Sequence, residues 1–276
     1  MYSYVSILST DNYLLGILVL NFSLQKTKPK HPFHVLVTPN LEQTTLNTLE
    51  LAGIKTISIE PIPNPHNPDK KDRRYYNYSK LNMWNTTQFQ KIVYLDADMV
   101  VMHNIDELFD KYNMSSTNSG GGIISSWKQL NSGLIVLEPS QSVFNDMKSK
   151  VGKIEKEKGK GDQAFLHCYY ADWPEMKELH LSHIYNVFHN QLDGYHKKHG
   201  YYLDEHIRTG NKNYDEKRVK IVHYIGQNKP WMKIDEIKKM EPKTLEEQAN
   251  KIWLKYFREF KKDLKSTGKL ENLEKN

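Results

Sequence analysis

Two aspartates, Asp96 and Asp98, interrupt an apolar, β-branched run that extends from Lys91 to Val101. In an extended strand, side chains two residues apart point to the same side, so we expect the pair to converge at the end of a buried strand. Buried carboxylates without a partner are unfavourable, and a divalent cation is the usual compensation. Oxygen ligands suit Mg²⁺ or Mn²⁺. The spacing therefore predicts a metal site, whose use depends on partners elsewhere in the chain.

The composition is ordinary for a globular enzyme, and the charge fits an anionic substrate better than nucleic acid. The chain has 276 residues, of which 38% are hydrophobic and 26% charged. Its formal charge of +6 comes from 39 Lys and Arg against 33 Asp and Glu. No compact basic stripe with interleaved aromatic residues is present, so nucleic acid is not an expected partner.

Cysteine usage and hydropathy predict the compartment. The single cysteine, Cys168, excludes an intramolecular disulfide framework and suits a reducing environment. The apolar stretch Leu14–Leu20 lacks a basic leader and is too short to span a bilayer. We therefore interpret it as a buried first helix, and predict no membrane span and a cytoplasmic location.

The elements that must position the aspartates begin with an alternating pattern. Strands and helices succeed one another in the ranges Tyr2–Ser9 (strand), Thr10 to about Lys26 (helix), Phe33–Thr38 (strand), Leu41–Ala52 (helix, closed by Gly53) and Thr56–Ile59 (strand). This order implies right-handed crossovers and a mainly parallel sheet, which is an α/β fold.

Further along the chain the pattern changes. We predict a loop at Pro61–Asp72, a helix at Tyr75–Gln88, a strand at Trp127–Leu137, a charged helix at Lys148–Gly161 and a strand at Val219–Tyr224. The small residues of Ser115–Gly122 suit a turn before an antiparallel edge strand. From Ile234 onward the pattern is helical, so we predict one domain at residues 1–233 and a helical C-terminal extension at 234–276.

The order of several motifs resembles the glycogenin-like family 8 of retaining glycosyltransferases, which have the GT-A (Rossmann-like) fold. This family also contains galactinol synthases and bacterial lipopolysaccharide glucosyltransferases. The matching blocks are Thr10 to Leu20, Ser79-Lys80-Leu81, Tyr94 to Val101, Asn104 to Phe109, Asn131-Ser132-Gly133, Gly161-Asp162-Gln163, Ile184-Tyr185-Asn186 and Val222 to Trp231. They follow the family's order, which is what makes them specific together.

The resemblance implies the metal ligands and the ion's cargo. Asp96, Ala97 and Asp98 match the family's DxD motif, and His223 matches the third protein ligand. Two carboxylates and an imidazole leave positions open for diphosphate oxygens in octahedral geometry. Mn²⁺ or Mg²⁺ would thus hold the diphosphate of a UDP-sugar as the leaving group.

Other matched positions are assigned to the donor. Gly226 and Lys229 resemble the loop over the diphosphate, where Gly permits close backbone approach and Lys supplies a charge. The remaining donor residues implied by the resemblance are Leu8, Thr10 and Tyr13 for the base and ribose, Lys80, and Asn131, Ser132, Gly133, Asp162 and Gln163 for the sugar. Arg73 or Arg74 are further candidates for phosphate or sugar contacts.

Asp162 and Gln163 are the residues to which the resemblance gives catalytic roles. Asp162 would bind sugar hydroxyls and Gln163 would lie near the anomeric carbon. Because an amide is a poor nucleophile, we predict attack by the acceptor on the face from which the diphosphate leaves. A diphosphate oxygen then takes the acceptor's proton, and the anomeric configuration is retained.

The chain departs from glycogenins in the residues linked to the acceptor. Gly159 stands where glycogenins carry an acidic residue, which weakens a direct glycogenin assignment. The segment Asn186–Asn213 also diverges and holds Tyr195, a conceivable self-glucosylation site. It lies among histidines whose spacing fits no zinc pattern and which we interpret as an acceptor-binding loop: His183, His189, His196, His199 and His206.

The hypothesis favoured by these residues is transfer of glucose from UDP-glucose to an external hydroxyl, such as galactosyl-hydroxylysine of a collagen-like protein. Self-glucosylation as in glycogenin and transfer to a polyol as in galactinol synthase are alternatives. A catalytically silent nucleotide-sugar-binding protein and a divalent-metal phosphohydrolase are further, less favoured hypotheses. A homodimer is a mild expectation from the resemblance.

Overall fold

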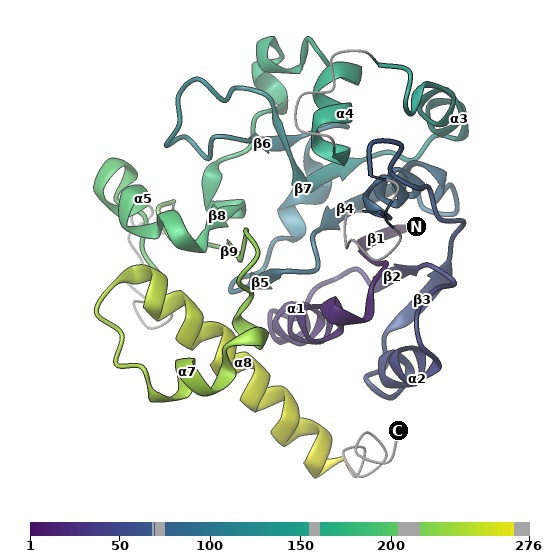
Figure 1. Cartoon of the computed structure of the whole chain (residues 1–276). Coiled ribbons are helices and arrows are strands. Elements are labelled where there is room, and N and C mark those ends of the chain that lie inside the picture. The colour runs from purple at the N-terminus through teal and green to yellow at the C-terminus, as the bar shows by residue number, and fades with distance from the viewer. Residues whose placement is uncertain (68, 70–74, 155–160, 204–215, 268–276) are drawn as a thin grey trace.

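The computed structural model describes residues 1–67, 69, 75–154, 161–203 and 216–267. Its centre is a six-stranded sheet with the order β3-β2-β1-β4-β7-β6 (Figure 1). The strands are β1 (Tyr2–Leu8), β2 (Phe33–Val37), β3 (Lys55–Ser58), β4 (Lys91–Leu95), β6 (Ser116–Asn118) and β7 (Leu130–Leu137). The first four are parallel, whereas β7 is antiparallel to β4 and β6 is antiparallel to β7. The α/β fold, its mainly parallel sheet and the antiparallel addition at its edge are therefore confirmed.

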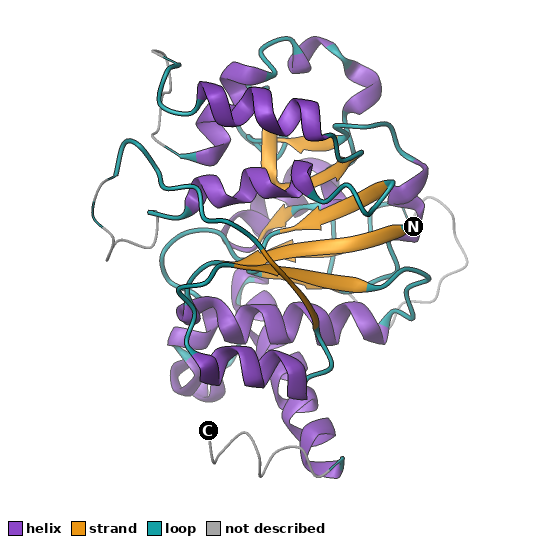
Figure 2. Cartoon of the chain, turned by 90° about the vertical axis from the view of Figure 1, so that its right-hand side faces the viewer, coloured by secondary structure: helices purple, strands orange, loops and turns teal. Residues whose placement is uncertain are grey.

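Helices cover both faces of this sheet, as the turned view in Figure 2 shows. Alternate side chains of a strand enter opposite clusters: Tyr4 and Leu8 pack with α1 (Leu14–Lys26), whereas Val5 packs with the helices of the other face. The first face also holds α2 (Gln43–Leu51), and the second holds the helical segments η2 (Asn77–Asn85), α3 (Gln141–Lys150) and α4 (Asp162–Tyr169). Two buried layers thus fix the strand ends that carry the site.

A second, three-stranded sheet lies beside the first, with the order β5-β9-β8. It contains β5 (Met99–Val101), β8 (Val187–Phe188) and β9 (Ile221–His223). Val100 and Val222 pack there with the aromatic residues of a third cluster, which includes Tyr195 of α5 (Leu192–His199). The two sheets meet where β4 gives way to β5.

The C-terminal segment forms two helices, α7 (Ile234–Lys239) and α8 (Leu245–Ser266). A capping box of Thr244 and Glu247 starts α8. Its inner face is buried, and Phe260 makes an edge contact with Phe22 of α1 at 5.8 Å between ring centroids. The predicted packing residues are confirmed as buried for Ile237, Trp253, Tyr256 and Phe260, with Phe257 half-buried. The boundary between domain and extension at residue 233 stays a prediction.

Two predicted helices differ from the structure. The segment predicted as a helix at Tyr75–Gln88 is a run of tight 3₁₀ turns, η2, whose side chains are mostly buried. The charged helix predicted from Lys148 instead ends there: α3 begins at Gln141 and stops at Lys150, and Lys153 and Ile154 lie beyond it. The N-cap Ser140 explains the earlier start, because its hydroxyl accepts a hydrogen bond from the Val143 N–H.

The remaining helical segments are short 3₁₀ turns. They are η1 (Asp11–Tyr13), η3 (Asp106–Asp110), η4 (Trp173–Glu175), η5 (Lys177–Leu179), η6 (His183–Tyr185), η7 (His189–Gln191) and η8 (Pro230–Met232). The predicted Gly53 helix terminus is confirmed by its left-handed φ of 71°. Among the described residues, none of the helices is both long and apolar enough for a membrane span.

Candidate functional site

Asp96 and Asp98 lie in a turn, and the prediction that they share one strand is wrong. β4 ends at Leu95 and β5 begins at Met99, so the chain leaves the large sheet and enters the small one across this turn. The two carboxylates converge because the turn brings them together, and strand periodicity has no part in it. The apolar residues on either side are buried in different sheets, which is why the polar residues fall at the crossing.

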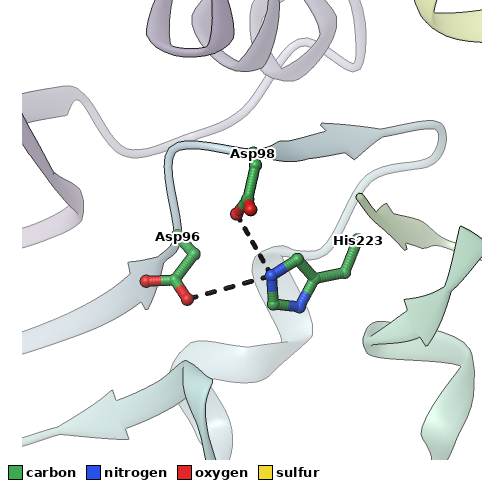
Figure 3. Close-up of side chains that lie close together, drawn as sticks. All are labelled: Asp96, Asp98 and His223. Carbon is green, nitrogen blue, oxygen red and sulfur yellow. Dashed lines mark ion pairs between the residues drawn. The ribbon is translucent and has the colours of Figure 1, made fainter. Parts of the chain in front are cut away.

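His223 completes the cluster from the neighbouring strand. It ends β9 and is paired with Met99, directly after the aspartate turn. Its Nε2 lies 3.1 Å from Asp98 Oδ1 and 3.8 Å from Asp96 Oδ2 (Figure 3). Ligand atoms of all three side chains lie within 4.8 Å of one another. The group predicted from the motifs is therefore assembled in space.

Asn186 fixes the orientation of the imidazole. Its amide nitrogen donates to Thr117 Oγ1 at 3.2 Å and to Asn131 Oδ1 at 2.9 Å, so its Oδ1 faces His223 Nδ1 at 2.9 Å. In this network Nδ1 is the donor, so Nε2 faces the two carboxylates. Once Nε2 carries no proton, its lone pair and the two carboxylate oxygens can share a cation. The donor set and its supporting hydrogen bond thus fit a divalent metal.

Gly133 provides the space that the histidine ring occupies. A Cβ at this position would lie 2.6 Å from His223 Cε1 and 3.1 Å from Asp96 Oδ2. The Gly133 carbonyl accepts from the Asp96 N–H at 2.8 Å, and its own N–H donates to Asn131 Oδ1. The Asn131-Ser132-Gly133 block lies inside strand β7, where it supports the cluster.

Two buried lysines balance the carboxylates. Lys80 Nζ lies 2.9 Å from Asp96 Oδ1 and 2.9 Å from Asp162 Oδ2. Burial by itself would lower the pKa of Lys80, but the Asp162 and Asp96 carboxylates outweigh it and raise that pKa well above its usual value. Lys229 pairs with Asp98 and donates to the Tyr224 carbonyl at 2.7 Å.

Asp98 shows the opposite shift for the same reason. Burial would raise the pKa of its carboxyl, yet the nearby His223 and Lys229 outweigh burial and hold the pKa well below the usual range. The carboxylate is therefore ionised at neutral pH despite being 8% exposed. A charged oxygen ligand is the form that a divalent cation requires.

Asp162 and Gln163 open helix α4 and are tied to strand β7. The Ser132 hydroxyl donates to Asp162 Oδ2 at 3.0 Å, and the Ser132 N–H donates to Gln163 Oε1 at 3.1 Å. Because the Gln163 oxygen is used in this way, its amide nitrogen points its two donors elsewhere. Gln163 lines the cleft beside His223.

Two adjoining cavities meet at the aspartate turn. The first, of about 290 Å³, is lined by residues of the β1 end, η2 and the turn: Ile7, Ser9, Thr10, Tyr13, Tyr76, Asn77, Lys80, Tyr94, Asp96, Ala97, Asp98 and Asp162. The second, of about 360 Å³, shares Tyr13, Asp96 and Asp98 with it. It is also lined by Ser119, Ile124, Trp127, Asn131, Ser132, Gly133, Gln163, Phe188, Gln191, His223, Ile225, Gly226 and Lys229. The predicted site residues other than Leu8 thus line one continuous cleft.

Leu8 is placed elsewhere. It is fully buried in the core between the sheet and α1. Its neighbours Ile7 and Ser9 line the cavity, as the alternation of side chains along β1 requires. Of the other candidates, Arg73, Arg74, Gly159 and His206 lie outside the described residues.

The divergent segment after Asn186 is mostly packed. Tyr195 is 0% exposed, so the conceivable self-glucosylation site is inaccessible in this structure. His183 and His199 stack at 6.2 Å, and His189 packs against Tyr224 at 5.2 Å between ring centroids. Among the described residues only Asp96, Asp98 and His223 form a group able to hold a metal.

The motifs did not identify the residues that support the ligands. Asn186 lies within a matched block, but its role as partner of His223 Nδ1 follows only from the hydrogen bonds. Gly16 of α1 is a second example, because a Cβ there would lie 2.5 Å from the Ala97 carbonyl oxygen and 2.9 Å from the Trp231 ring. A glycine within an otherwise apolar helix was the available signal, since it marks close packing.

Comparison with known proteins gives one consistent result. The family model described as Glycosyl transferase family 8 matches residues 4–235. The chain is 31% identical over 236 residues to inositol phosphorylceramide glucuronosyltransferase 1 of Arabidopsis thaliana, and 29% identical over 235 residues to glycogenin-1 of Oryctolagus cuniculus. Each match covers 83% of this chain, but 42% of the first relative and 65% of the second. The chain thus spans less than two thirds of the length of these relatives.

Solved structures with the same fold include the galactosyltransferase LgtC in complex with donor and acceptor sugar analogues. The TM-score is 0.64 with 14% identity, over 94% of this chain and 96% of that one. The glycosyltransferase GlyE of Streptococcus pneumoniae follows at a TM-score of 0.60 and 15% identity, over 96% of this chain and 64% of that one. At these identities the likeness concerns the fold, which is of the GT-A type.

Proposed function

The chain belongs to glycosyl transferase family 8, and on this premise we propose that it is a metal-dependent retaining enzyme that transfers a hexose from a UDP-sugar to an external hydroxyl. The observation that carries the proposal is the cluster of Asp96, Asp98 and His223 at the meeting point of the two cavities. Around it, two lysines and one further carboxylate are buried at short distances from one another.

Asp96, Asp98 and His223 would hold Mn²⁺ or Mg²⁺. When bound, the ion neutralises negative charge on the diphosphate leaving group. Lys229 adds a second positive charge from the loop that follows β9. In that loop Gly226 adopts a left-handed φ of 90°, with nothing within 4 Å of its Cβ position. This loop can therefore bring its backbone close to a phosphate.

The first cavity suits the nucleoside part of the donor. Tyr13 and Tyr76 line it with the side chains of Thr10 and Asn77, so it offers aromatic surface together with hydroxyl and amide groups. It opens at Asp96 and Asp98 into the second cavity, where Ser132 and Gln163 lie. We assign the sugar to that junction, within reach of Asp162.

An uncharged hexose is favoured over a hexuronate as the donor sugar. The proteins similar to this chain include glucuronosyltransferases, so UDP-glucuronate is the alternative to UDP-glucose. Within the described part of the cleft the lysines are Lys80 and Lys229, and both are already paired with aspartates. A sugar carboxylate would lack a cation of its own there, and it would face Asp162.

For the transfer step we propose attack on the face from which the diphosphate leaves. The bond between the anomeric carbon and the diphosphate oxygen breaks, a bond from that carbon to the acceptor oxygen forms, and the leaving oxygen takes the acceptor's proton. Asp162, held by Lys80 and Ser132, binds sugar hydroxyls, and Gln163 orients the reacting carbon with its amide nitrogen. Detection of a glycosyl adduct on the wild-type protein would overturn this step.

The acceptor is proposed to be external. The burial of Tyr195 supports this, because the tyrosine that the sequence analysis considered for self-glucosylation cannot reach a donor from the core. A sugar hydroxyl on a glycan or glycoprotein is favoured over a polyol. The cytoplasmic location and the homodimer stay predictions.

Release of UDP tests the proposal directly. The protein is incubated with UDP-glucose, UDP-galactose or UDP-glucuronate, in Mn²⁺ or in EDTA, with Asp96→Ala as the inactive control. We expect UDP release that depends on Mn²⁺ and is fastest with UDP-glucose. Absence of both UDP release and metal-dependent UDP binding would refute the proposed enzymatic activity. A hexose mass increment on the protein itself would instead favour self-glucosylation.

A further inference from the structure

The outer wall of the second cavity is formed by a closed loop between β6 and β7. The Gly120 N–H donates to the Trp127 carbonyl at 3.1 Å, and the Trp127 N–H donates to the Ile124 carbonyl at 3.1 Å. The Ser119 N–H donates to the Gln129 carbonyl at 2.7 Å at the base of the loop. A Cβ at Gly120 would lie 2.2 Å from the Ile124 carbonyl oxygen, so the loop closes only around glycine. The backbone that carries Trp127 is therefore held by its own hydrogen bonds.

Trp127 is exposed, unlike the other tryptophans of the chain. Its side chain is 57% exposed, whereas Trp84, Trp173 and Trp253 are each 1% exposed and Trp231 is half-buried. No aromatic ring of the described residues stacks on it. Yet it lines the cavity that contains His223 and Gln163. A large apolar ring is thus left facing solvent at the rim of the cleft.

Gln191 provides a polar group on the same wall. Its Oε1 is buried and has no hydrogen-bond partner, although Gln191 lines the cavity. An unpartnered buried oxygen has a cost, and rotation of the Gln191 amide that turns Oε1 into the cavity would let a ligand hydroxyl donate to it. Ile124, Phe188 and Ile225 supply the apolar surface between Gln191 and the rest of the wall. Among the described residues that line this cavity, the charged groups are at the floor, around Asp98.

We propose that Trp127 and Gln191 form the subsite for the acceptor, and that the acceptor is an uncharged glycan bound through a pyranose ring. The apolar C–H face of the pyranose packs on the Trp127 indole, and one ring hydroxyl donates a hydrogen bond to Gln191 Oε1 after the amide has turned into the cavity. This wall offers aromatic surface and one amide. A pyranose needs both, because its C–H face is apolar and its edge carries hydroxyl groups. The inference rests on the proposed function.

The wall also argues against other acceptors. A phosphorylated or otherwise anionic headgroup would lack a cation on the described part of this wall. A linear polyol or a serine hydroxyl would leave most of the indole face uncovered. Because Trp127 stands at the rim, a glycan stacked there extends from the cleft into solvent and can belong to a larger glycan or glycoprotein.

Steady-state kinetics with defined acceptors test the subsite. Maltose, lactose and xylobiose serve as uncharged pyranose probes, and myo-inositol and sorbitol as polyol probes, at fixed UDP-glucose and Mn²⁺. The variants are Trp127→Ala, Trp127→Phe and Gln191→Ala. Tyr112→Ala is the matched control, because Tyr112 is 66% exposed and does not line the cleft. Saturation-transfer NMR with UDP and Mg²⁺ measures binding of the same probes.

We expect Trp127→Ala to raise the KM of a pyranose acceptor by about 10-fold, since aromatic contacts contribute on this scale. It should change the acceptor KM much more than the KM of UDP-glucose. Trp127→Phe should recover most of the affinity, Gln191→Ala should raise the acceptor KM several-fold, and Tyr112→Ala should match wild type. Thermal melts check that the variants remain folded.

Three outcomes overturn the subsite. They are an acceptor KM unchanged in Trp127→Ala, transfer to polyols but to none of the disaccharides, and no saturation transfer from the wild-type protein to any disaccharide. Failure of the proposed function is separate from these: there the wild-type protein neither releases UDP nor binds it in a metal-dependent way. An enzyme that uses UDP-glucose normally but is indifferent to Trp127 would refute only the subsite.

Discussion

The floor and the rim of the cleft are built in opposite ways. At the floor, Lys80 joins Asp96 to Asp162, and Asn186 holds His223, so the charged groups are buried and paired. At the rim, Trp127 is exposed and Gln191 Oε1 has no partner. Buried charges must be arranged before a ligand arrives, because leaving one unpaired is costly. An exposed aromatic ring carries no such requirement. We infer that the floor defines the donor chemistry and that the rim can change with the acceptor.

The largest effect is expected from removing a charge at the floor. Asp98→Asn should lower transfer by about 1,000-fold or more, because it removes an anionic ligand candidate and leaves Lys229 without its carboxylate. Asp146→Asn is the matched control, since Asp146 is a half-buried aspartate on α3, outside the cleft, that pairs with Lys150 and accepts from Tyr169. UDP release and Mn²⁺ titration measure the effect. A variant with near-normal turnover would show that the floor does not set the donor chemistry.

A stability effect should follow from Lys80→Met. The change leaves Asp96 and Asp162 facing each other without their shared cation, so unfolding free energy should fall by about 3–5 kcal/mol. Lys91→Met removes a lysine paired with the exposed Glu138, and about 1 kcal/mol or less is expected. Urea unfolding compares the two variants. Added Mn²⁺ should restore part of the loss in Lys80→Met. Equal losses in the two variants would contradict the contrast between a buried pair and one whose carboxylate is exposed.

A smaller effect is expected one step away from the ligands. Asn186→Ala removes the partner of His223 Nδ1, so Mn²⁺ affinity should weaken by about 10- to 100-fold while the fold is kept. Asn145→Ala is the control, because Asn145 is an exposed amide on α3 that accepts from Gln141. Calorimetric titration with Mn²⁺ in the presence of UDP gives the affinities. Unchanged affinity in Asn186→Ala would mean that the imidazole is oriented by something else.

The smallest effect concerns His183, which packs against the loop between β6 and β7. A Cβ at Gly122 would lie 2.8 Å from the His183 ring, which is therefore packed against this loop. Burial, followed by the charges of His199, His180 and Lys198, lowers the pKa of His183 to about 4. The unfolded chain then binds a proton near pH 6.5 before the folded protein does, so stability should fall as the pH falls from 6.5 to about 4.

His183→Gln removes this contribution. With allowance for solvent at a half-buried ring, the wild-type protein should lose about 1–2 kcal/mol more than the variant between pH 7 and pH 4.5. Urea unfolding at several pH values measures the difference. Parallel pH curves for the two proteins would show that the ring is not held neutral by its packing.

Much of the fold could be predicted from local patterns. The alternation of strands and helices over the first 59 residues, and the helices after Ile234, match the structure because burial of one face imposes a period on the sequence. The segment Tyr75–Gln88 resembled a helix, yet it forms 3₁₀ turns whose conformation is set by packing between α3, α4 and the sheet. Its composition alone did not carry that information.

The site divides in the same way. The types and order of Asp96, Asp98 and His223 were sufficient to predict a metal group, because few other residues suit that chemistry. The mechanism of their convergence was predicted wrongly, since a turn between two sheets brings them together. Leu8 differs from the prediction by one position, and a shift of one residue in a strand reverses the face. Trp127 began a predicted strand, and its sequence context did not indicate an exposed ring.

The sequence by itself determined the α/β class, the family resemblance and the identity of the charged groups, because these depend on residue types, their spacing and their order. Only the tertiary structure decided which groups meet and which remain free. The Asn186 contact joins residues 37 positions apart, and the Lys80 contact with Asp162 joins two elements that β4 and β7 separate in the sequence. Such contacts depend on how sheets and helices pack. For that reason the donor floor could be anticipated from motifs, and the acceptor rim could not.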